Sequence, residues 1–303
     1  MTMLDSTGLC GILPALVTPV QSDDTIDVKA ADALFSWLKQ QGVDGVVPLG
    51  GTGEYGALSR SERNRFVEMS SKAMAGCGPV VPGVLDTGFH DALDAARDFA
   101  AAGADALLVI TPYYTNPSQA GIRDYFLRYA DNSPLPILIY EIPYRTRIAI
   151  DPDVMHELSR HERIIGMKAC NTDMYHYLRV VAGVDTSFTV LSGEDTLFPL
   201  HVAAGAKGGI VVTANLLPRT WRHLFDLASS GKTEEALALH RELMPLMNLA
   251  FAETNPGPMK SVMDLIGVDA PQMLMPLRQP KTELRDALRQ EYSRLLGQFE
   301  KAA

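Results

Sequence analysis

Residues 137–168 read ILIYEIPYRTRIAIDPDVMHELSRHERIIGMK and contain two short apolar runs with a helical stretch between them. The runs are Ile137–Tyr140 and Ile164–Lys168, and neither alternates apolar with polar residues. Continuous apolar runs of this length are typical of strands that are covered on both faces, as in a parallel sheet. The amphipathic stretch Pro152–Arg160 supplies a crossover, so this segment predicts one β-α-β unit.

The same alternation extends through most of the chain. Six further apolar runs occur at Ile12–Val17, Gly45–Leu49, Val80–Val84, Ala106–Ile110, Phe188–Ser192 and Gly209–Val212. Further amphipathic stretches separate them at Val28–Gln41, Ser61–Ala75, His90–Ala102 and Gln119–Ala130. Eight strand–helix units spaced by about 20–35 residues fit a (β/α)8 TIM barrel, whose usual length is roughly 250 residues. On the pattern alone, an open doubly wound sheet remains the alternative.

The last part of the chain has a different pattern. Helical segments Thr233–Met247, Gly257–Ile266 and Lys281–Phe299 follow one another without a convincing strand. Prolines and glycines at residues 255–258 break the chain between the first two. We therefore expect an α/β barrel over residues 8–230 and a small helical C-terminal domain over residues 231–303.

Composition limits the possible partners. The 303-residue chain carries a formal net charge of -9 that no basic patch offsets, which argues against nucleic acid. No apolar run approaches the roughly 20 residues that span a membrane. The N-terminus shows no signal-peptide pattern, and Cys10, Cys77 and Cys170 lack CxxC spacing. We expect a reduced cytoplasmic protein in which Cys77 and Cys170 fill small core spaces.

The segment Gly51-Thr52-Gly53-Glu54-Tyr55-Gly56 matches the GxGxxG pattern of dinucleotide-binding turns. The helix begins too late for that function, because the capping box Ser59-Arg60-Ser61-Glu62 places its start after the glycines. No Gly-Lys-Ser or Gly-Lys-Thr follows, so the segment is not a P-loop either. The exposed N–H groups of such a turn can still bind a smaller anion, such as a carboxylate.

Lys168 and Tyr140 end neighbouring predicted strands, where barrel enzymes place their active sites. A partly desolvated amine there has a lowered pKa and can attack a carbonyl carbon. A tyrosine within reach can pass protons to and from the carbinolamine that precedes an imine. The structural alternatives are a lysine that extends its charge into solvent and a rim tyrosine that faces water. The residues alone leave both interpretations open.

Thr52 and Arg145 are candidates for binding carboxylates. Thr52 offers a hydroxyl and a backbone N–H after the second predicted strand, and Arg145 can form a bidentate contact. Plain turn chemistry and a surface ion pair are the structural alternatives. The seven histidines show neither an HxH nor an HExxH pattern, so we expect no metal site. No GxSxG segment indicates a serine hydrolase.

Seven short motifs follow one another along nearly the whole chain. They are Gly50-Gly51-Thr52-Gly53-Glu54, Thr111-Pro112-Tyr113-Tyr114, Tyr140-x-Ile142-Pro143, Gly166-Met167-Lys168, Leu191-Ser192-Gly193-Glu194-Asp195, Val212-Thr213-Ala214-Asn215 and Asn255-Pro256-Gly257-Pro258-Met259-Lys260. In order and spacing the chain resembles the dihydrodipicolinate synthase / N-acetylneuraminate lyase family. The resemblance implies a (β/α)8 barrel with a C-terminal three-helix domain. It also implies a homotetramer of two tight dimers, in which Tyr114 reaches into the neighbouring subunit's site.

The resemblance further implies a lyase that uses neither metal nor cofactor and acts on a 2-keto acid and an aldehyde. Lys168 is implied to form an imine with the keto acid, and Tyr140 to relay protons. Thr52 is implied to bind the keto-acid carboxylate. Gly193 and Ile210 are implied to lie beside the bound keto acid. Imine formation makes the adjacent carbon acidic, so carbon–carbon bonds can form or break there.

The pattern after Tyr140 is similar to that of members that condense pyruvate with aspartate semialdehyde, and Arg145 matches their carboxylate-binding arginine. Two residues depart from it: Gly51, in the same substrate-binding turn as Thr52, lacks a relay hydroxyl, and Glu141 adds a possible negative charge near the site. A catabolic relative is therefore an alternative, such as a deoxy sugar acid dehydratase or aldolase, an N-acetylneuraminate lyase or a pyrroline-4-hydroxy-2-carboxylate deaminase. A keto-acid-binding protein without catalysis is another.

Overall fold

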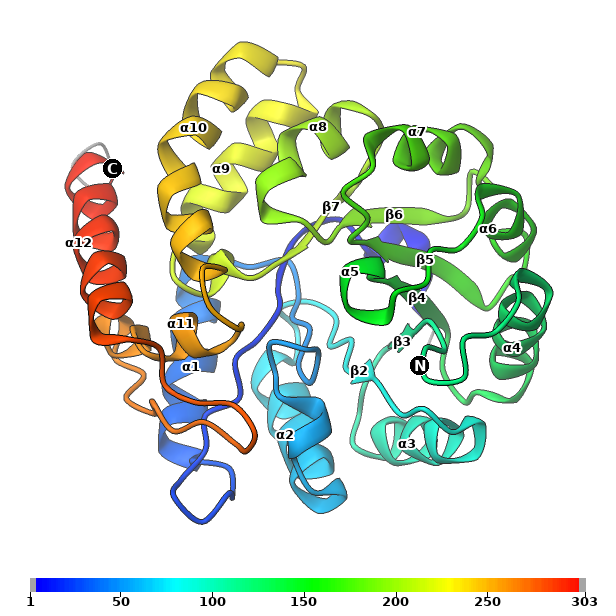
Figure 1. Ribbon diagram of the computed structural model, residues 1–303, viewed down its shortest axis with the longest axis horizontal. Helices are drawn as coiled ribbons and strands as arrows, with labels where there is room; N and C mark the ends of the chain where they lie inside the picture. The colour runs from blue at the N-terminus through cyan, green and yellow to red at the C-terminus, as the bar shows by residue number, and fades with distance from the viewer. Residues whose placement is uncertain (1–3, 300–303) are drawn as a thin grey trace.

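Seven parallel strands form one curled sheet in the computed structural model, which describes residues 4–299 (Figure 1). The strands are β1 (Gly11–Pro14), β2 (Gly83–Val84), β3 (Leu107–Ile110), β4 (Ile137–Glu141), β5 (Ile164–Ala169), β6 (Thr189–Ser192) and β7 (Gly208–Val211). Consecutive strands pair from β2 to β7, and β7 pairs with β1. This order is that of the predicted barrel and excludes the doubly wound sheet, whose strand order reverses inside the sheet.

The predicted second strand, Gly45–Leu49, joins β1 to β2 by two isolated bridges rather than by a full ladder. Val47 bridges to Ala15 and Val46 bridges to Val80, both in parallel. The N–H groups of Val46 and Val47 donate hydrogen bonds of 2.9 and 3.0 Å to the two flanking segments. The eightfold barrel is therefore confirmed, whereas the prediction of a regular second strand is wrong.

A proline contributes to the irregularity of this segment. Pro48 has no N–H to donate to the neighbouring segment. Leu49 then leaves the extended conformation, with a φ of 61°. Backbone hydrogen bonds still join the segment to both neighbours. Leu16 N donates to the carbonyl oxygen of Val47, and Val81 N donates to that of Val46.

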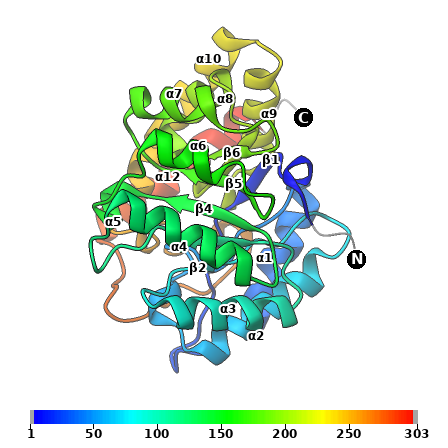
Figure 2. The same ribbon diagram turned by 90° about the vertical axis from the view of Figure 1, so that its right-hand side faces the viewer.

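Helices cover the outside of the sheet, and Figure 2 shows α3, α4 and α6 side by side along it. The helices around the barrel are α1 (Val28–Gln41), α2 (Arg60–Met74), α3 (Phe89–Ala101), α4 (Gln119–Asn132), α5 (Pro143–Thr146), α6 (Pro152–Leu158), α7 (Met174–Gly183), α8 (Phe198–Ala203) and α9 (Pro218–Ser229). Short 3-10 helices cover Ser6–Gly8, Tyr55–Ala57, Asp195–Leu197 and Thr213–Asn215. Helix α1 has the predicted bounds because Asp27 caps its start and Gly42 ends it with a φ of 70°.

The capping box before α2 is half confirmed. Ser59 Oγ accepts a hydrogen bond from Glu62 N at 3.3 Å, so the helix starts after the glycine-rich turn, as predicted. The Glu62 carboxylate does not bond back to the cap. It accepts a hydrogen bond from Ile26 N at 2.6 Å and so ties the start of α2 to the loop before α1.

Helices α10 (Thr233–Ala250), α11 (Gly257–Lys260) and α12 (Thr282–Phe299) follow the barrel and lie on one side of it (Figure 1). Helix α10 packs against α8, α9 and α12. The predicted helix Gly257–Ile266 is divided into α11 and a 3-10 helix over Met263–Ile266. The domain boundary at residue 230 stays a prediction. Among the described helices, none is long and apolar enough to cross a membrane.

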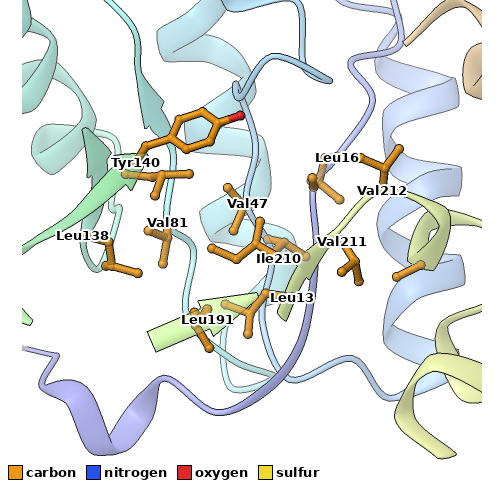
Figure 3. Close-up of a cluster of buried hydrophobic side chains, with 14 of the residues drawn as sticks. Leu13, Leu16, Val47, Val81, Leu138, Tyr140, Leu191, Ile210, Val211 and Val212 are labelled. Atoms are coloured by element: carbon orange, nitrogen blue, oxygen red, sulfur yellow. The ribbon is translucent and has the colours of Figure 1, made fainter. Parts of the chain in front are cut away.

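A packed apolar core fills the barrel interior, as Figure 3 shows. Leu13, Val47, Leu138, Leu191 and Ile210 come from five different segments, and each is at most 1% exposed. The barrel is therefore closed at its centre, and space for a ligand lies only at an end of the strands.

The cysteines divide into two groups. Cys170 is buried, as predicted, at the end of β5. Cys77 is exposed in the turn after α2, where Gly76 adopts a φ of 77°, so its prediction as a core residue is wrong. Cys10 is also exposed.

Candidate active site

Lys168 and Tyr140 occupy paired positions on neighbouring strands. The register of β4 and β5 sets their Cα atoms opposite each other, and Lys168 Nζ lies 4.8 Å from the centroid of the Tyr140 ring. Both residues are buried. Figure 3 shows Tyr140 at the edge of the apolar core, with its hydroxyl directed away from Leu138 and Val81. The predicted proximity of the phenol and the amine is confirmed.

Burial keeps the neighbours of Lys168 in their neutral forms. It is the main cause that raises the pKa of the Tyr140 hydroxyl well above its ordinary value, while Arg145 acts in the opposite direction. Burial likewise raises the pKa of the Cys170 thiol, against the charge of Lys168. A neutral phenol holds a proton that it can donate, and a neutral thiol is a weak nucleophile. Neither of these two neighbours is therefore a strong nucleophile in its buried form.

Gly193 lies directly against the Lys168 side chain. A Cβ atom at this position would come within 2.9 Å of Lys168 Cε and within 2.1 Å of Cys170 Sγ. Cys170 Sγ also donates to the carbonyl oxygen of Gly193 at 3.4 Å. Glycine lets the main chain after β6 run alongside the lysine stem without a clash. The structure thus brings Gly193 next to Lys168, and its implied place beside a bound keto acid stays a prediction.

Thr52, Gly51 and Arg145 form a second polar cluster together with Asn255. Asn255 Nδ2 donates to Thr52 Oγ1 at 2.9 Å, and Arg145 Nη2 donates to the carbonyl oxygen of Asn255 at 3.5 Å. The guanidinium carbon of Arg145 lies 3.6 Å from the place that a Cβ atom of Gly51 would take. The two predicted carboxylate-binding residues are therefore brought together from different loops. Asn255, which joins them, was not predicted as a site residue.

A buried ion pair connects the same turn to the C-terminal helices. Lys260 Nζ lies 2.6 Å from Glu54 Oε1, and the two side chains are 1% and 0% exposed. Leu274 N donates to the other carboxylate oxygen at 2.8 Å. Both residues occur in family-like motifs, but nothing local in the sequence links positions that are 206 residues apart.

The two acidic residues after β6 differ in their partners. The Asp195 carboxylate accepts hydrogen bonds from Val212 N at 3.0 Å and from Thr213 N and Oγ1 at 2.8 and 2.7 Å. Within the described residues, Glu194 Oε1 is buried and has no hydrogen-bond partner. Burial, and then the charge of Asp195, raise the pKa of Glu194 to about 7, while Lys168 acts to lower it.

A carboxyl group that titrates near neutral pH beside an amine is a candidate for proton transfer. Sequence reasoning missed this role of Glu194. The signal that was available is its position directly after a predicted strand end.

A cavity of about 710 Å³ opens beside these groups. Arg145, Glu194 and Asn255 contribute polar groups to its wall, and Tyr144 and Phe251 contribute rings. Lys168 is not among its lining residues, but its contact Gly193 directly precedes Glu194 in the chain. The volume fits a small-molecule ligand, and the guanidinium fits a ligand that carries a carboxylate. Over residues 4–299, no group of three or more His, Cys, Asp or Glu side chains is arranged to hold a metal ion.

Glu141 faces the surrounding helices instead of the barrel interior. Its Oε1 accepts a hydrogen bond from Ile150 N at 3.0 Å and lies 3.1 Å from His176 Nε2. Hydrogen bonding to Glu141 raises the pKa of His176. Alternation along β4 explains the direction, because Tyr140 points inward. The charge predicted near the site is therefore paired with a histidine of α7.

Two further predicted site residues, Ile210 and Tyr114, lie outside the polar clusters described above. Ile210 is fully buried in β7 opposite Leu13, within the core of Figure 3. Tyr114, in the loop after β3, is 84% exposed. A place beside the keto acid and a place in a neighbouring subunit's site therefore stay predictions for these two residues.

Known proteins share both the sequence pattern and the fold. A sequence model of the Dihydrodipicolinate synthetase family matches residues 8–298. The 4-hydroxy-tetrahydrodipicolinate synthase of Haloarcula marismortui is 38% identical over 280 residues, which cover 92% of this chain and 91% of that protein. The one from Gluconacetobacter diazotrophicus is 33% identical over 290 residues, which cover 94% and 98%.

A solved structure gives the same result. The crystal structure of dihydrodipicolinate synthase from Aquifex aeolicus has a TM-score of 0.89 to this chain at 32% identity, and covers 96% of this chain and 98% of its own. The relatives exceed 30% identity over nine-tenths or more of both chains. With its barrel, its C-terminal helices and a family match from residue 8 to residue 298, this chain belongs to the dihydrodipicolinate synthetase family of lyases.

Proposed function

We propose that this chain is a 4-hydroxy-tetrahydrodipicolinate synthase, which condenses pyruvate with aspartate semialdehyde through an imine on Lys168. The observation that carries the proposal is the buried pair of Lys168 and Tyr140, with the amine 4.8 Å from the ring centroid. Relatives of that name, 33% and 38% identical to this chain, support the choice of reaction.

In the proposed mechanism, the neutral Lys168 amine attacks the keto carbon of pyruvate. The carbinolamine loses water to give a protonated imine, and Tyr140 donates the proton that the departing hydroxyl takes up. The protonated imine withdraws electrons, so the methyl carbon loses a proton to the Tyr140 phenolate and the imine becomes an enamine. The enamine carbon attacks the aldehyde carbon, and Tyr140 returns that proton to the aldehyde oxygen as the new carbon–carbon bond forms. The amine of the second substrate then displaces Lys168 and frees the enzyme.

Two carboxylate sites follow from the polar cluster. Thr52 offers its hydroxyl, and the turn around Gly51 its N–H groups, to the carboxylate of pyruvate. Arg145, on the wall of the cavity, binds the carboxylate of the aldehyde substrate. Arg145→Ala should therefore raise the KM of the aldehyde by about tenfold or more and change the KM of pyruvate less. Equal effects on both substrates would contradict this assignment.

Reduction with borohydride tests the imine. The enzyme is incubated with pyruvate, reduced and digested, and the peptide that carries Lys168 is examined by mass spectrometry. We expect a reduced pyruvate adduct on Lys168 and none in the Lys168→Met variant. An adduct confined to another lysine, or none at all where calorimetry shows pyruvate binding, would rule out the proposal. The second result would favour a keto-acid-binding protein without catalysis.

A catabolic relative is the second candidate, and Gly51 is the observation that favours it. The position next to Arg145 carries no side chain, so it supplies no hydroxyl to a proton relay. A substrate panel separates the candidates: pyruvate with aspartate semialdehyde, N-acetylneuraminate, deoxy sugar acids and pyrroline-4-hydroxy-2-carboxylate. The synthase proposal requires the first pair to give the highest kcat/KM.

We further propose a homotetramer of two tight dimers, in which Tyr114 completes the neighbouring subunit's site. The 84% exposure of Tyr114 supports a contact that one chain alone does not provide. Tyr114→Phe should lower kcat, and sedimentation should show whether the variant still assembles. Metal-independent activity and a cytoplasmic location also stay predictions, which dialysis against a chelator and cell fractionation can test.

A further inference from the structure

The turn Gly50–Glu54, which carries Thr52, is not held in place by its backbone alone. Gly53 N donates to the carbonyl oxygen of Gly50 at 3.0 Å, but the next hydrogen bond, from Glu54 N to Gly51, is 3.4 Å long. Glu54 adopts a φ of 55°, which is unfavourable for a residue with a side chain. Other contacts must therefore stabilise this conformation.

One of those contacts comes from the barrel, where Thr18 Oγ1 donates to the carbonyl oxygen of Gly53 at 2.8 Å. The others come from the C-terminal helices. Glu54 Oε1 lies 2.6 Å from Lys260 Nζ, and Oε2 accepts a hydrogen bond from Leu274 N at 2.8 Å. Both charged side chains are at most 1% exposed, so water cannot replace either partner. Burial lowers the pKa of Lys260, while the charge of Glu54 and its hydrogen bond act to raise it.

Helix α11 contacts the turn at both of its ends. Lys260 is its last residue, and Asn255, two residues before its start, donates to Thr52 Oγ1 at 2.9 Å. With Asn255 as donor, the hydroxyl proton of Thr52 is left to be donated to a bound anion. The direction in which the Thr52 hydroxyl donates its proton therefore depends on the position of the turn relative to α11.

We infer that Lys260 is a positioning residue for keto-acid binding, which acts through Glu54 to hold the Thr52 turn in its carboxylate-binding geometry. The inference rests on the proposed function, because it concerns the same keto acid. The C-terminal helices then form part of the pyruvate site, although Lys260 does not touch the substrate.

The test is the double variant Glu54→Gln with Lys260→Met, which removes both buried charges together. The pyruvate concentration that gives half-maximal borohydride adduct on Lys168 is measured, along with kcat and the KM of the aldehyde. We expect the half-maximal concentration to rise by about tenfold or more, a saturating adduct as complete as in the parent protein, and a much smaller change in the aldehyde KM.

A matched control lies in the same part of the chain. Arg289→Met removes a partly exposed ion pair with Asp264 and should leave the half-maximal pyruvate concentration unchanged. A folded double variant with the parent value would overturn the inference and leave Lys260 a structural residue. A control that shifts as much as the double variant would overturn it too, since general loosening would then explain the effect.

If the double variant does not fold, the single variant Glu54→Gln tests the inference. Its amide oxygen can still accept the Leu274 hydrogen bond, and Lys260 can remain buried as a neutral amine. A rise in half-maximal pyruvate supports the inference, and the parent value contradicts it. Failure of the proposed function is distinguishable, because the parent protein would then form no adduct at all.

Discussion

Glu54 and Glu194 lie in two loops that follow strand segments of the same barrel, and their carboxylates have opposite surroundings. Glu54 uses both oxygens, one for Lys260 and one for Leu274 N. Glu194 has a buried oxygen without a partner within the described residues, and its pKa is raised to about 7.

These different surroundings indicate a structural role for the Glu54 carboxylate and a chemical role for the Glu194 carboxylate. A buried carboxylate that is fully paired has one stable protonation state and fixes the geometry around it. A carboxylate that lacks partners can gain or lose a proton near neutral pH. Position at the end of a barrel strand therefore does not by itself identify a reactive group. The partners of the side chain identify it.

The largest expected effect comes from breaking the paired carboxylate. Glu54→Ala leaves Lys260 buried without its partner, and should lower the free energy of unfolding by about 3–5 kcal/mol. Denaturant unfolding measures the change. Asp264→Ala, which removes an exposed ion pair, is the control and should cost about 1 kcal/mol or less. A loss for Glu54→Ala no larger than the control would remove the contrast between the two acids.

A smaller effect of opposite sign is expected at the unpaired carboxylate. The pKa of Glu194 is raised from 4.5 to about 7, so the folded state keeps a proton that the unfolded state releases. Stability must then fall as pH rises through this window. Glu194→Gln should flatten that decline and stabilise the protein at about pH 8 by on the order of 1 kcal/mol, allowing for solvent screening.

Thermal melts across this pH range measure the slope. Glu253→Gln, on the wall of the same cavity, is the matched control. If Glu194 also exchanges protons with the substrate, the pH profile of kcat should lose a limb near pH 7 in the Glu194→Gln variant alone. An unchanged profile with a flattened stability slope would restrict Glu194 to an electrostatic effect on folding.

The smallest expected effect tests Glu141, whose environment is intermediate. One of its oxygens accepts a hydrogen bond from Ile150 N and lies 3.1 Å from His176 Nε2, and the other is buried without a partner in the described part of the chain. Hydrogen bonding to Glu141 raises the pKa of His176 against its partial burial, with Asp173 favouring and Arg179 opposing the charged form. The stabilisation is therefore present below the ordinary histidine pKa and is lost as pH rises through the raised value.

His176→Gln should flatten this dependence as pH rises above the ordinary histidine pKa, by less than about 1 kcal/mol. Melting temperatures of the variant and the parent protein, measured from below that pKa to mildly alkaline pH, test it. If the melting temperature of the parent protein rises with pH over the same interval, the Glu141–His176 contact does not govern the pH dependence of stability there.

The sequence predicted the fold where local and overall patterns agree. Helix α1 was predicted to the residue because Asp27 and Gly42 mark its ends. The second strand failed because apolar content alone does not show that Pro48 removes a ladder donor and that Leu49 leaves the extended conformation. The helix over Gly257–Ile266 failed for a similar reason, since its periodic pattern gave no sign of the change to a 3-10 helix at Met263.

The part of the site that lies at the ends of the strands could be predicted from the sequence. Lys168 and Tyr140 follow from strand order, since equivalent ends of neighbouring parallel strands must meet. The outward direction of Glu141 also follows from alternation along β4, although the sequence analysis did not apply it. The pairing of Glu54 with Lys260 and the lack of a partner at the buried Glu194 oxygen could not be predicted. Both depend on how the C-terminal helices pack on the loops.

The distance along the chain between Glu54 and Lys260 has a consequence for biosynthesis. During translation, Glu54 is synthesised 206 residues before Lys260. Until then the Glu54 carboxylate lacks the ammonium partner that it has in the folded protein. A nascent chain stalled before residue 260 would therefore carry the turn Gly50–Glu54 without the ion pair that ties it to the C-terminal helices.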